Sequence, residues 1–474
     1  MVEMTVGELL AATGACLVSG GADVRCRGCV IDSREVREGS IFVAIEGNRV
    51  DGNDFAPAAV KAGAACIVLS REPTAELVWL AADAGCAVCT VDDPTSFLLS
   101  LAAWYRSTLP ATVVGITGSI GKTTTKDVLT ALLRTRFSVH ATKGNHNNLI
   151  GLPLTVLSAP ADTEVLVLEM GMNHPGEIGR LARCARPDIG IITKVGTSHV
   201  GLLGGRENIA RAKAEMTCGM SPGSVLVLGG EDEFTPFIAE NFAEPKGIEV
   251  LRCGTGEGDA VRARDIRVDA DGHPSFVLEL PDEEPLLCTL SLMGAQSVQN
   301  ALYAAAVAHR LGVTGEEICG AFGALSVTGR RQEVRRARNG ARVIDDSYNA
   351  SPESMAAALD LLAELPCEGS RIAVLGEMGE LGDEAPRLHA LVGAYAAAKK
   401  PALLICVGGD AADQIASAAR LMGLDPARIR TVPSTEVLIE RYRDLLGADD
   451  LALVKGSRFV GLDRYVEEVC TDAR

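Results

Sequence analysis

Residues 113–125 read VVGITGSIGKTTT, and this stretch decides the fold of the chain. A β-branched apolar run enters a glycine turn and leaves it as a helix-forming segment, which is the order of a strand, a phosphate loop and a helix. Glycine lets the backbone curl so that its N–H groups point at phosphate oxygens, and a helix N-terminus adds positive potential. We therefore predict a nucleotide-binding α/β domain whose loop contacts are Gly118, Ser119, Gly121 and Thr124.

Two side chains of this loop suit a triphosphate. Lys122 can reach the β- and γ-phosphates, and the hydroxyl of Thr123 can ligate magnesium. The loop departs from the standard phosphate-loop pattern, because Ile116 stands where that pattern has its first glycine. The loop alone fits a kinase, a GTPase or a ligase. A GTPase is the weakest of these, since the sequence contains no N-K-x-D element to read guanine.

The bulk composition is typical of a protein with several α/β domains. The 474 residues include 50 glycines and only 4% aromatic residues, which suits tight strand–helix turns. A prior of about 150 residues per domain predicts three domains. The net charge of -17 argues against non-specific nucleic-acid binding, which depends on Lys and Arg at the phosphates. Because membrane-length apolar runs and a basic signal segment are both absent from the sequence, we expect a cytoplasmic protein.

The fourteen cysteines are scattered singly and often lie in apolar runs, so we expect reduced, buried thiols rather than disulfides. Cys26 and Cys29 form one C-x-x-C pair. No second pair follows with the spacing of a zinc site, and structural zinc needs four ligands.

Short apolar runs followed by glycine recur along the chain and predict buried parallel strands in βα units. They form three groups, at 40–45, 65–70 and 87–91; at 113–117, 165–170, 189–193 and 225–228; and at 342–346, 371–375, 402–407 and 451–454. Residues 259–290 alternate polar with apolar side chains, which predicts a small antiparallel sheet appended to the middle domain. We place linkers near Pro110 and at 327–329. The predicted domains are residues 1–108, 109–328 and 329–474.

Polar side chains just past two middle-domain strands predict a metal site. Glu169 ends an apolar strand, where α/β folds place ligands, and a carboxylate suits magnesium. His199 follows the next strand in a Gly/Ser loop, and neutral imidazole can ligate metal. Residues 207–215 predict a helix, on which composition alone makes Lys213 a surface lysine.

Together these residues resemble the Mur ligase family, and the resemblance extends over nearly the whole chain. The shared signatures are the T-G-x-x-G-K-T-T loop, E-M-G at 169–171, I-T-x-V-G-x-x-H at 192–199 and I-A-x-A-K-x-E at 209–215. The resemblance implies an ATP-dependent ligase that joins a carboxylate to an amine through an acyl phosphate. It also implies a uridine-nucleotide-binding N-terminal domain, a central ATPase domain and a Rossmann-like C-terminal domain.

The family's functional residues carry over onto the matching positions. Lys122 and Thr123 would bind phosphate and magnesium, while Glu169 and His199 would serve two magnesium sites. Lys213 would be carbamylated, which turns an amine into a carboxylate-like metal ligand. The resemblance thus implies catalytic roles for Lys122, Glu169, His199 and Lys213, and metal contacts for Thr123, Glu169, His199 and Lys213.

Two stretches resemble the branch of the family that adds D-alanyl-D-alanine to UDP-N-acetylmuramoyl-tripeptide. Residues 32–44 are similar to the uridine-nucleotide domain of the tripeptide-adding and dipeptide-adding members, and residues 147–154, NNLIGLPL, resemble a run of the dipeptide-adding member. The substrate contacts that this resemblance implies are Ser33, Arg34, Asn147 and Asn148.

Residues 346–354, DSYNASPES, resemble the C-terminal signature of the same branch. Tyr348 and Asn349 would face the incoming dipeptide, and Asp346 would accept hydrogen bonds from ribose hydroxyls. Two further matches are LGEMGELG at 375–382 and VKGSR at 454–458.

The remaining nucleotide contacts include a departure from the family pattern. The run G-x-H-N-x-x-N reads GAQSVQN here, so Gln296 and Ser297 replace His and Asn, and only Asn300 remains for the adenine side. Arg331 would reach across to the γ-phosphate when the domains close, with Arg330 as the competing choice.

Two other interpretations stay open. One is another ligase of the superfamily, which adds a diamino acid, or glutamate to a folate. The other is a non-catalytic nucleotide-binding descendant, supported only by Gln296 and Ser297. We expect ATP and magnesium as ligands, small-molecule substrates, a monomer, and neither nucleic acid nor membrane as a partner.

Overall fold

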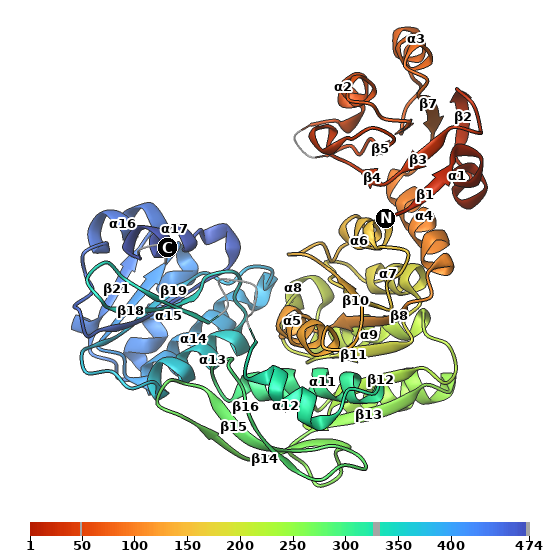
Figure 1. Ribbon diagram of the computed structural model, residues 1–474. Helices are drawn as coiled ribbons and strands as arrows, with labels where there is room; N and C mark the ends of the chain where they lie inside the picture. The colour runs from red at the N-terminus through yellow and green to blue at the C-terminus, as the bar shows by residue number, and fades with distance from the viewer. Residues whose placement is uncertain (48–49, 326–331, 471–474) are drawn as a thin grey trace.

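Three large sheets follow one another along the chain, and a two-stranded sheet lies beside the first (Figure 1). The structure, a computed structural model, describes residues 1–47, 50–325 and 332–470. Every strand expected from the apolar runs is present, with ends within two residues of the prediction. The boundary at residue 108 stays a prediction, and the predicted second linker at 327–329 lies outside the described residues. None of the described helices is long and apolar enough to cross a membrane.

The N-terminal sheet has the order β2-β7-β6-β5-β4. Its strands are β2 (Cys16–Ser19), β4 (Cys29–Val30), β5 (Ile41–Val43), β6 (Cys66–Leu69) and β7 (Ala87–Thr90). Strands β4 to β7 are parallel, and β2 is antiparallel to β7. Beside the sheet lie the pair β1 (Glu3–Thr5) and β3 (Arg25–Arg27) and the helices α1 (Val6–Thr13), α2 (Ala56–Lys61) and α3 (Ala75–Asp83).

The middle sheet has nine strands in the order β16-β15-β14-β13-β12-β11-β8-β10-β9. The parallel part comprises β8 (Thr112–Thr117), β9 (Val139–Ala141), β10 (Val165–Glu169), β11 (Ile189–Ile192), β12 (Val225–Gly229) and β13 (Glu249–Gly254). The antiparallel strands are β14 (Val261–Val268), β15 (Pro274–Glu279) and β16 (Leu286–Thr289). They continue the parallel sheet, because β14 pairs with the free edge of β13. The small antiparallel sheet predicted from the alternation is therefore an extension and not a separate sheet.

Helices cover both faces of the middle sheet, because successive side chains of a buried strand point to opposite faces. Val114 packs with α5 (Lys122–Leu133), α11 (Gln296–Arg310) and α12 (Gly315–Phe322). The opposite face carries α4 (Pro94–Thr108), α6 (Gly151–Ser158), α7 (Glu177–Ala185) and α9 (Arg206–Ala214). Helix α4 joins the first two sheets, since Tyr105 donates a 2.8 Å hydrogen bond to the carbonyl oxygen of Ala159.

The C-terminal sheet has the order β17-β18-β22-β19-β20-β21. Its strands are β17 (Glu333–Arg336), β18 (Arg342–Asp346), β19 (Arg371–Gly376), β20 (Leu403–Val407), β21 (Ile429–Val432) and β22 (Leu451–Lys455), all parallel except β17. Its helices are α13 (Pro352–Glu364), α14 (Ala385–Lys399), α15 (Asp410–Leu421), α16 (Thr435–Tyr442) and α17 (Asp463–Val469).

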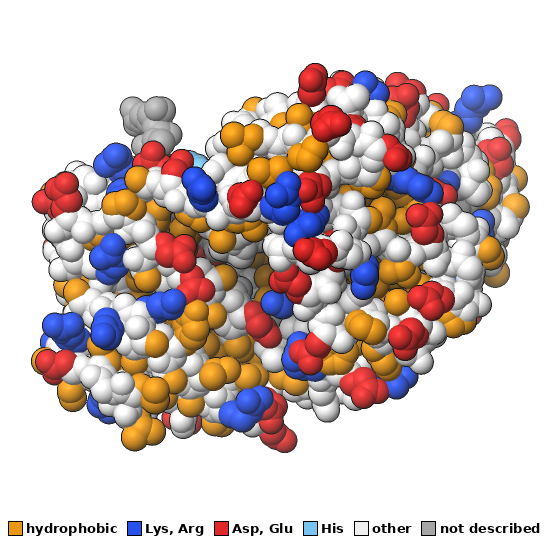
Figure 2. All heavy atoms as spheres, turned by 90° about the horizontal axis from the view of Figure 1, so that it is seen from below, with side chains coloured by type: hydrophobic (Ala, Val, Ile, Leu, Met, Phe, Trp, Pro, Cys, Tyr) orange, Lys and Arg blue, Asp and Glu red, His pale blue; other side chains and the backbone are white. Residues whose placement is uncertain are grey.

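The face of the molecule shown in Figure 2 carries charged side chains of both signs. On the described part of the face shown in Figure 2, acidic and basic side chains are interspersed rather than gathered into one basic patch.

One cysteine prediction is wrong. Cys288 of β16 and Cys319 of α12 form a disulfide, whereas the other cysteines are free. The two residues are 31 positions apart in sequence and meet only because α12 packs beside β16. Spacing along the chain could not reveal this pair.

We expect Phe276→Ala to destabilise the middle domain by about 3–5 kcal/mol, the usual cost of emptying a buried phenyl site. Phe276 is fully buried in β15, and its ring centroid lies 6.1 Å from that of Phe322 in α12. Differential scanning calorimetry would measure the loss. The matched control is Leu287→Ala on β16, because Leu287 is 77% exposed. Equal melting temperatures for the two variants would contradict the conclusion that burial of Phe276 stabilises the antiparallel strands of the middle sheet.

Candidate active site

The phosphate loop is held between the end of β11 and helix α11. Gly118 and Gly121 have φ values of 143° and 85°, in the region that favours glycine. A Cβ atom at Gly118 would lie 2.0 Å from the Thr193 hydroxyl, and one at Gly121 would lie 2.3 Å from the Asn300 side-chain oxygen. Both glycines are therefore required by close packing as well as by backbone conformation.

Two loop residues carry groups that suit a phosphate ligand. The Ser119 hydroxyl is buried and has no hydrogen-bond partner among the described residues. Its backbone N–H donates to the carbonyl oxygen of Lys194 at 2.7 Å, which fixes the loop. The Lys122 ammonium donates to the carbonyl oxygens of Gly118 at 2.7 Å and Ser119 at 3.4 Å, so it lies directly over the loop.

Glu169 and Thr123 meet as the sequence predicts for a magnesium site. Glu169 is only 2% exposed at the end of β10, and its Oε2 accepts a 2.8 Å hydrogen bond from the Thr123 hydroxyl. The other carboxylate oxygen, Oε1, accepts from the Asn147 amide at 2.7 Å. This arrangement presents oxygen donors beside the phosphate loop, which is the donor chemistry that magnesium prefers.

The two asparagines expected at the substrate have local partners. Asn147 orients Glu169. Asn148 caps α6, because its Oδ1 accepts hydrogen bonds from the backbone N–H groups of Ile150 and Gly151. Contact of either side chain with substrate stays a prediction.

Lys213 is buried, with 1% of its surface exposed, so its interpretation as a surface lysine is wrong. Within the described ranges its ammonium has no hydrogen-bond or ion-pair partner. Burial lowers the pKa of Lys213 well below its usual value, and the charge of Lys122 lowers it further, against the opposing effect of Glu215 and Glu380. A lowered pKa favours the neutral amine, which is the form that carbamylation requires.

His199 lies where the middle and C-terminal domains touch. Its Nδ1 lies 2.8 Å from a carboxylate oxygen of Glu380, a close polar contact without the alignment of a hydrogen bond. This contact lowers the pKa of Glu380. The backbone of His199 has a φ of 65°, an unfavourable value for a non-glycine residue that its surroundings must hold in place.

Two more contacts join the loop around His199 to the C-terminal domain. Glu353 of α13 accepts a 2.7 Å hydrogen bond from the backbone N–H of Thr197 and a 3.1 Å bond from its hydroxyl. Gly201 packs so closely on Gly382 that a Cβ atom would lie 2.3 Å from the Gly382 nitrogen. Sequence reasoning missed Glu353 and Glu380 as site residues, although both lie within stretches that match the family.

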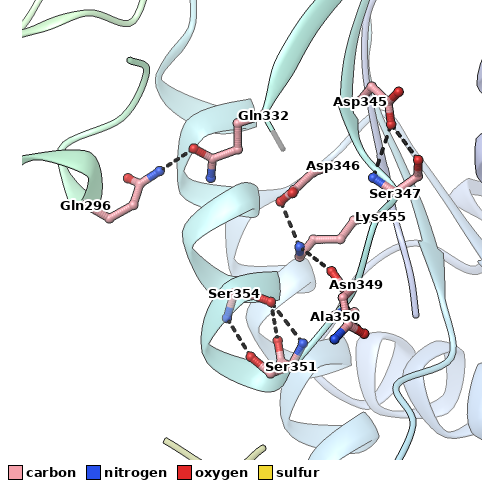
Figure 3. Close-up of polar contacts among 10 residues, drawn as sticks. All are labelled: Gln296, Gln332, Asp345, Asp346, Ser347, Asn349, Ala350, Ser351, Ser354 and Lys455. Atoms are coloured by element: carbon pink, nitrogen blue, oxygen red, sulfur yellow. Dashed lines mark hydrogen bonds and ion pairs between the residues drawn. The ribbon is translucent and has the colours of Figure 1, made fainter. Parts of the chain in front are cut away.

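Asp346 is engaged in a buried ion pair (Figure 3). Its Oδ2 lies 2.7 Å from the Lys455 ammonium, which also donates to the carbonyl oxygen of Asn349 at 2.9 Å. The pair fixes the loop that carries Tyr348 and Asn349. A ribose contact of Asp346 stays a prediction, and one of its two carboxylate oxygens is already occupied by the lysine.

Gln296, which departs from the family pattern, is hydrogen-bonded to a residue of the C-terminal domain. Figure 3 shows the Gln296 amide directed at the side chain of Gln332, to which it donates at 2.9 Å. Asn300 accepts a 3.3 Å hydrogen bond from the Thr125 hydroxyl and contacts the phosphate loop. Its expected adenine contact is untested and stays a prediction. Arg330 and Arg331 lie outside the described residues.

Other site residues are not brought together. Ser33 and Arg34 lie in a short helix, η1 (Ser33–Glu35), of the N-terminal domain, apart from α5 (Figure 1). The Arg34 guanidinium binds Asp32 at 2.6 Å and lowers the pKa of that carboxyl to about 2. Across the described residues, no cluster of three or more His, Cys, Asp or Glu side chains forms a self-sufficient metal site.

Family models match each part of the chain. The model of the Mur ligase family catalytic domain matches residues 25–103, the middle-domain model 116–308, and the glutamate ligase domain model 329–458. The UDP-N-acetylmuramoyl-tripeptide--D-alanyl-D-alanine ligase of Bacillus subtilis strain 168 is 34% identical over 442 residues, with 93% of each chain covered. The chain belongs to the Mur ligase family. The resemblance seen in the sequence is thereby confirmed.

Solved structures support the architecture of this Mur ligase. A crystal structure of MurF from Acinetobacter baumannii superposes with a TM-score of 0.86 at 29% identity and covers 98% of both chains. The MurF ligase of Thermotoga maritima, crystallised in complex with ADP, gives a TM-score of 0.80 at 29% identity, with 93% of this chain and 96% of that chain covered. These similarities confirm the predicted α/β fold with three domains.

We expect the stability of the Mur ligase in carbon-dioxide-free buffer to rise with pH below 10.5, the ordinary pKa of lysine. Burial lowers the folded-state pKa of Lys213, so between that pKa and 10.5 the unfolded chain binds more protons than the folded chain. Stability therefore increases by up to about 1.4 kcal/mol per pH unit from this group. Chemical denaturation of wild type and Lys213→Met would measure it. Parallel pH profiles for the two proteins would contradict a lowered pKa.

Proposed function

We propose that this Mur ligase uses ATP to join D-alanyl-D-alanine to the terminal carboxylate of UDP-N-acetylmuramoyl-tripeptide, a step of peptidoglycan precursor synthesis. The observation that carries the proposal is the buried Thr123–Glu169 contact beside Lys122. It occurs in a chain that is similar over its whole length to ligases with this named activity. We further propose that the enzyme acts in the cytoplasm as a monomer.

The chemical obstacle is that a carboxylate is a poor electrophile. In the proposed reaction, the substrate carboxylate attacks the γ-phosphorus of ATP in line, and ADP leaves, which gives an acyl phosphate. The amine of the dipeptide then attacks the acyl carbon, loses a proton, and expels inorganic phosphate. Catalysis of phosphoryl transfer depends mainly on positioning and on neutralising charge.

The chain supplies these effects from two domains. Gly118, Ser119, Gly121 and Thr124 would position the phosphates through the loop, and the Lys122 ammonium would move from the loop carbonyls onto the phosphate oxygens. Asn300, Arg331 and Asp346 are the proposed remaining nucleotide contacts. Contact of the two domains around His199 would exclude water from the acyl phosphate.

The residues present suit magnesium. We propose that Thr123, Glu169, His199 and a carbamylated Lys213 would hold magnesium at two sites. Bound magnesium would neutralise charge on the transferring phosphoryl group. The buried, neutral amine of Lys213 supports the carbamate, since an exposed, protonated lysine would not react.

Release of inorganic phosphate tests the function. With ATP and magnesium, we expect release to require both UDP-N-acetylmuramoyl-tripeptide and D-alanyl-D-alanine, because each ligand completes one step. Lys122→Ala should reduce the rate by at least about 100-fold, the scale of losing one electrostatic contact in a transition state. Lys61→Ala, on the exposed surface of the N-terminal domain, is the matched control. Release that depended on a diamino acid or on glutamate instead of the dipeptide would overturn the proposal.

Lys213→Ala tests the carbamate. We expect this variant to lose activity and to regain part of it when acetate or formate is added, because a small carboxylate can occupy the space of the missing group. The same salts should leave the wild-type rate unchanged, and chloride at equal ionic strength should not restore the variant. Full activity of Lys213→Ala without added carboxylate would exclude the carbamate.

A further inference from the structure

Arg458 stands at the carboxyl end of the C-terminal sheet, directly after β22, in the short helix η8 (Arg458–Val460). Its guanidinium carbon lies 5.6 Å from the centroid of the Tyr348 ring. A cation over an aromatic face is held in place without losing its charge. The side chain is exposed, and within the described residues no carboxylate forms an ion pair with it. Arg458 is therefore a preorganised cation that faces solvent.

Other cations near this edge are engaged by acids. Lys455 is buried against Asp346 at 2.7 Å. Arg387 lies 2.5 Å from a carboxylate oxygen of Glu384. Arg458 differs from both because its near neighbour is an uncharged ring, which leaves its N–H donors available for a ligand.

Arg458 is also close to the contact between the two domains. The Ser457 hydroxyl accepts a 2.9 Å hydrogen bond from the backbone N–H of Gly379. A Cβ atom on Gly379 would lie 3.0 Å from the ring of Phe459. The next residue, Glu380, reaches His199 at 2.8 Å. The chain around Arg458 thus packs against the loop that touches the proposed reaction centre.

The loop that joins these positions is rigidly held. The buried imidazole of His389 accepts a 2.9 Å hydrogen bond from the backbone N–H of Met378 through Nε2. Its Nδ1 therefore carries the proton and donates to the carbonyl oxygen of Ala385 at 2.7 Å. A fixed loop keeps the spacing between Arg458 and Glu380 constant, which is what a site that measures ligand length requires.

We infer that Arg458, braced on Tyr348, binds the C-terminal carboxylate of the dipeptide substrate and sets its distance from the reacting carbonyl. The inference rests on the proposed function. A dipeptide carries its nucleophilic amine and its carboxylate at opposite ends, at most about 7 Å apart. A guanidinium matches a carboxylate with two parallel N–H···O bonds, so it fixes direction as well as distance. Arg458 is thus a specificity-determining residue for the free acid at the second position.

The test compares D-alanyl-D-alanine with its C-terminal amide, D-alanyl-D-alaninamide, in the phosphate-release assay with ATP and UDP-N-acetylmuramoyl-tripeptide. For the wild type, we expect KM for the amide to be about 10- to 100-fold above KM for the acid, the scale of a lost charge-assisted hydrogen bond. Arg458→Met should raise KM for the acid by a similar factor and remove the discrimination between the two dipeptides. KM for ATP should not change, which also shows that the variant is folded.

Two further variants make the result specific. Arg458→Lys should recover part of the preference for the acid, because it restores the charge without the planar fork. Arg464→Met is the matched control, since Arg464 is a similarly exposed arginine in α17 that pairs with Glu436 at 2.6 Å. It should keep the wild-type preference.

The outcomes separate this inference from the proposed function. An active wild type together with an Arg458→Met variant that still prefers the acid would overturn the inference alone. Equal increases in KM for acid and amide would also overturn it, because they would indicate a structural role. A wild type that releases no phosphate with either dipeptide would overturn the proposed function, and the inference with it.

Discussion

The close packing of the phosphate loop is the constraint on which the rest of the site depends. Gly118 leaves no room for a side chain beside Thr193, and Gly121 leaves none beside Asn300. These contacts tie the loop to the end of β11 and to α11, so three elements distant in sequence set one backbone path. The first turn of α5 then places Thr123 against Glu169 without further adjustment. Backbone donors and a carboxylate are thus held in place by contacts within the protein, which reduces the ordering that nucleotide binding requires.

The residues that follow β11 contact both the phosphate loop and the C-terminal domain. Thr193 supports the phosphate loop, while Thr197 and His199, a few residues later, contact Glu353 and Glu380. Domain contact and phosphate positioning therefore share one short segment. A ligase with a hydrolysable intermediate benefits from this arrangement, because the site is complete only when the second domain is near.

Two buried lysines of this enzyme differ in whether an acid pairs with them. Lys455 is buried but paired with Asp346, so its charge is compensated and it fixes a loop. Lys213 is buried and unpaired within the described residues, so its pKa is lowered and its neutral amine is favoured. The difference lies in the neighbours. Lys455 has an acid 2.7 Å away, whereas for Lys213 burial and the charge of Lys122 outweigh the opposing effect of Glu215 and Glu380. Lys455 therefore suits a structural role, and Lys213 suits the proposed chemical one.

Local sequence alone determined the parallel strands, the phosphate loop and the placement of Glu169. The apolar runs and glycine turns that specify them involve only residues that are close together in sequence. It could not reveal that Lys213 is buried, that Cys288 meets Cys319, or that Asn147 orients Glu169. It also missed the contacts of Glu353 and Glu380 with the middle domain. Only the tertiary structure decided these points, since desolvation and pairing depend on which distant segments pack together, and that packing is set by the whole chain.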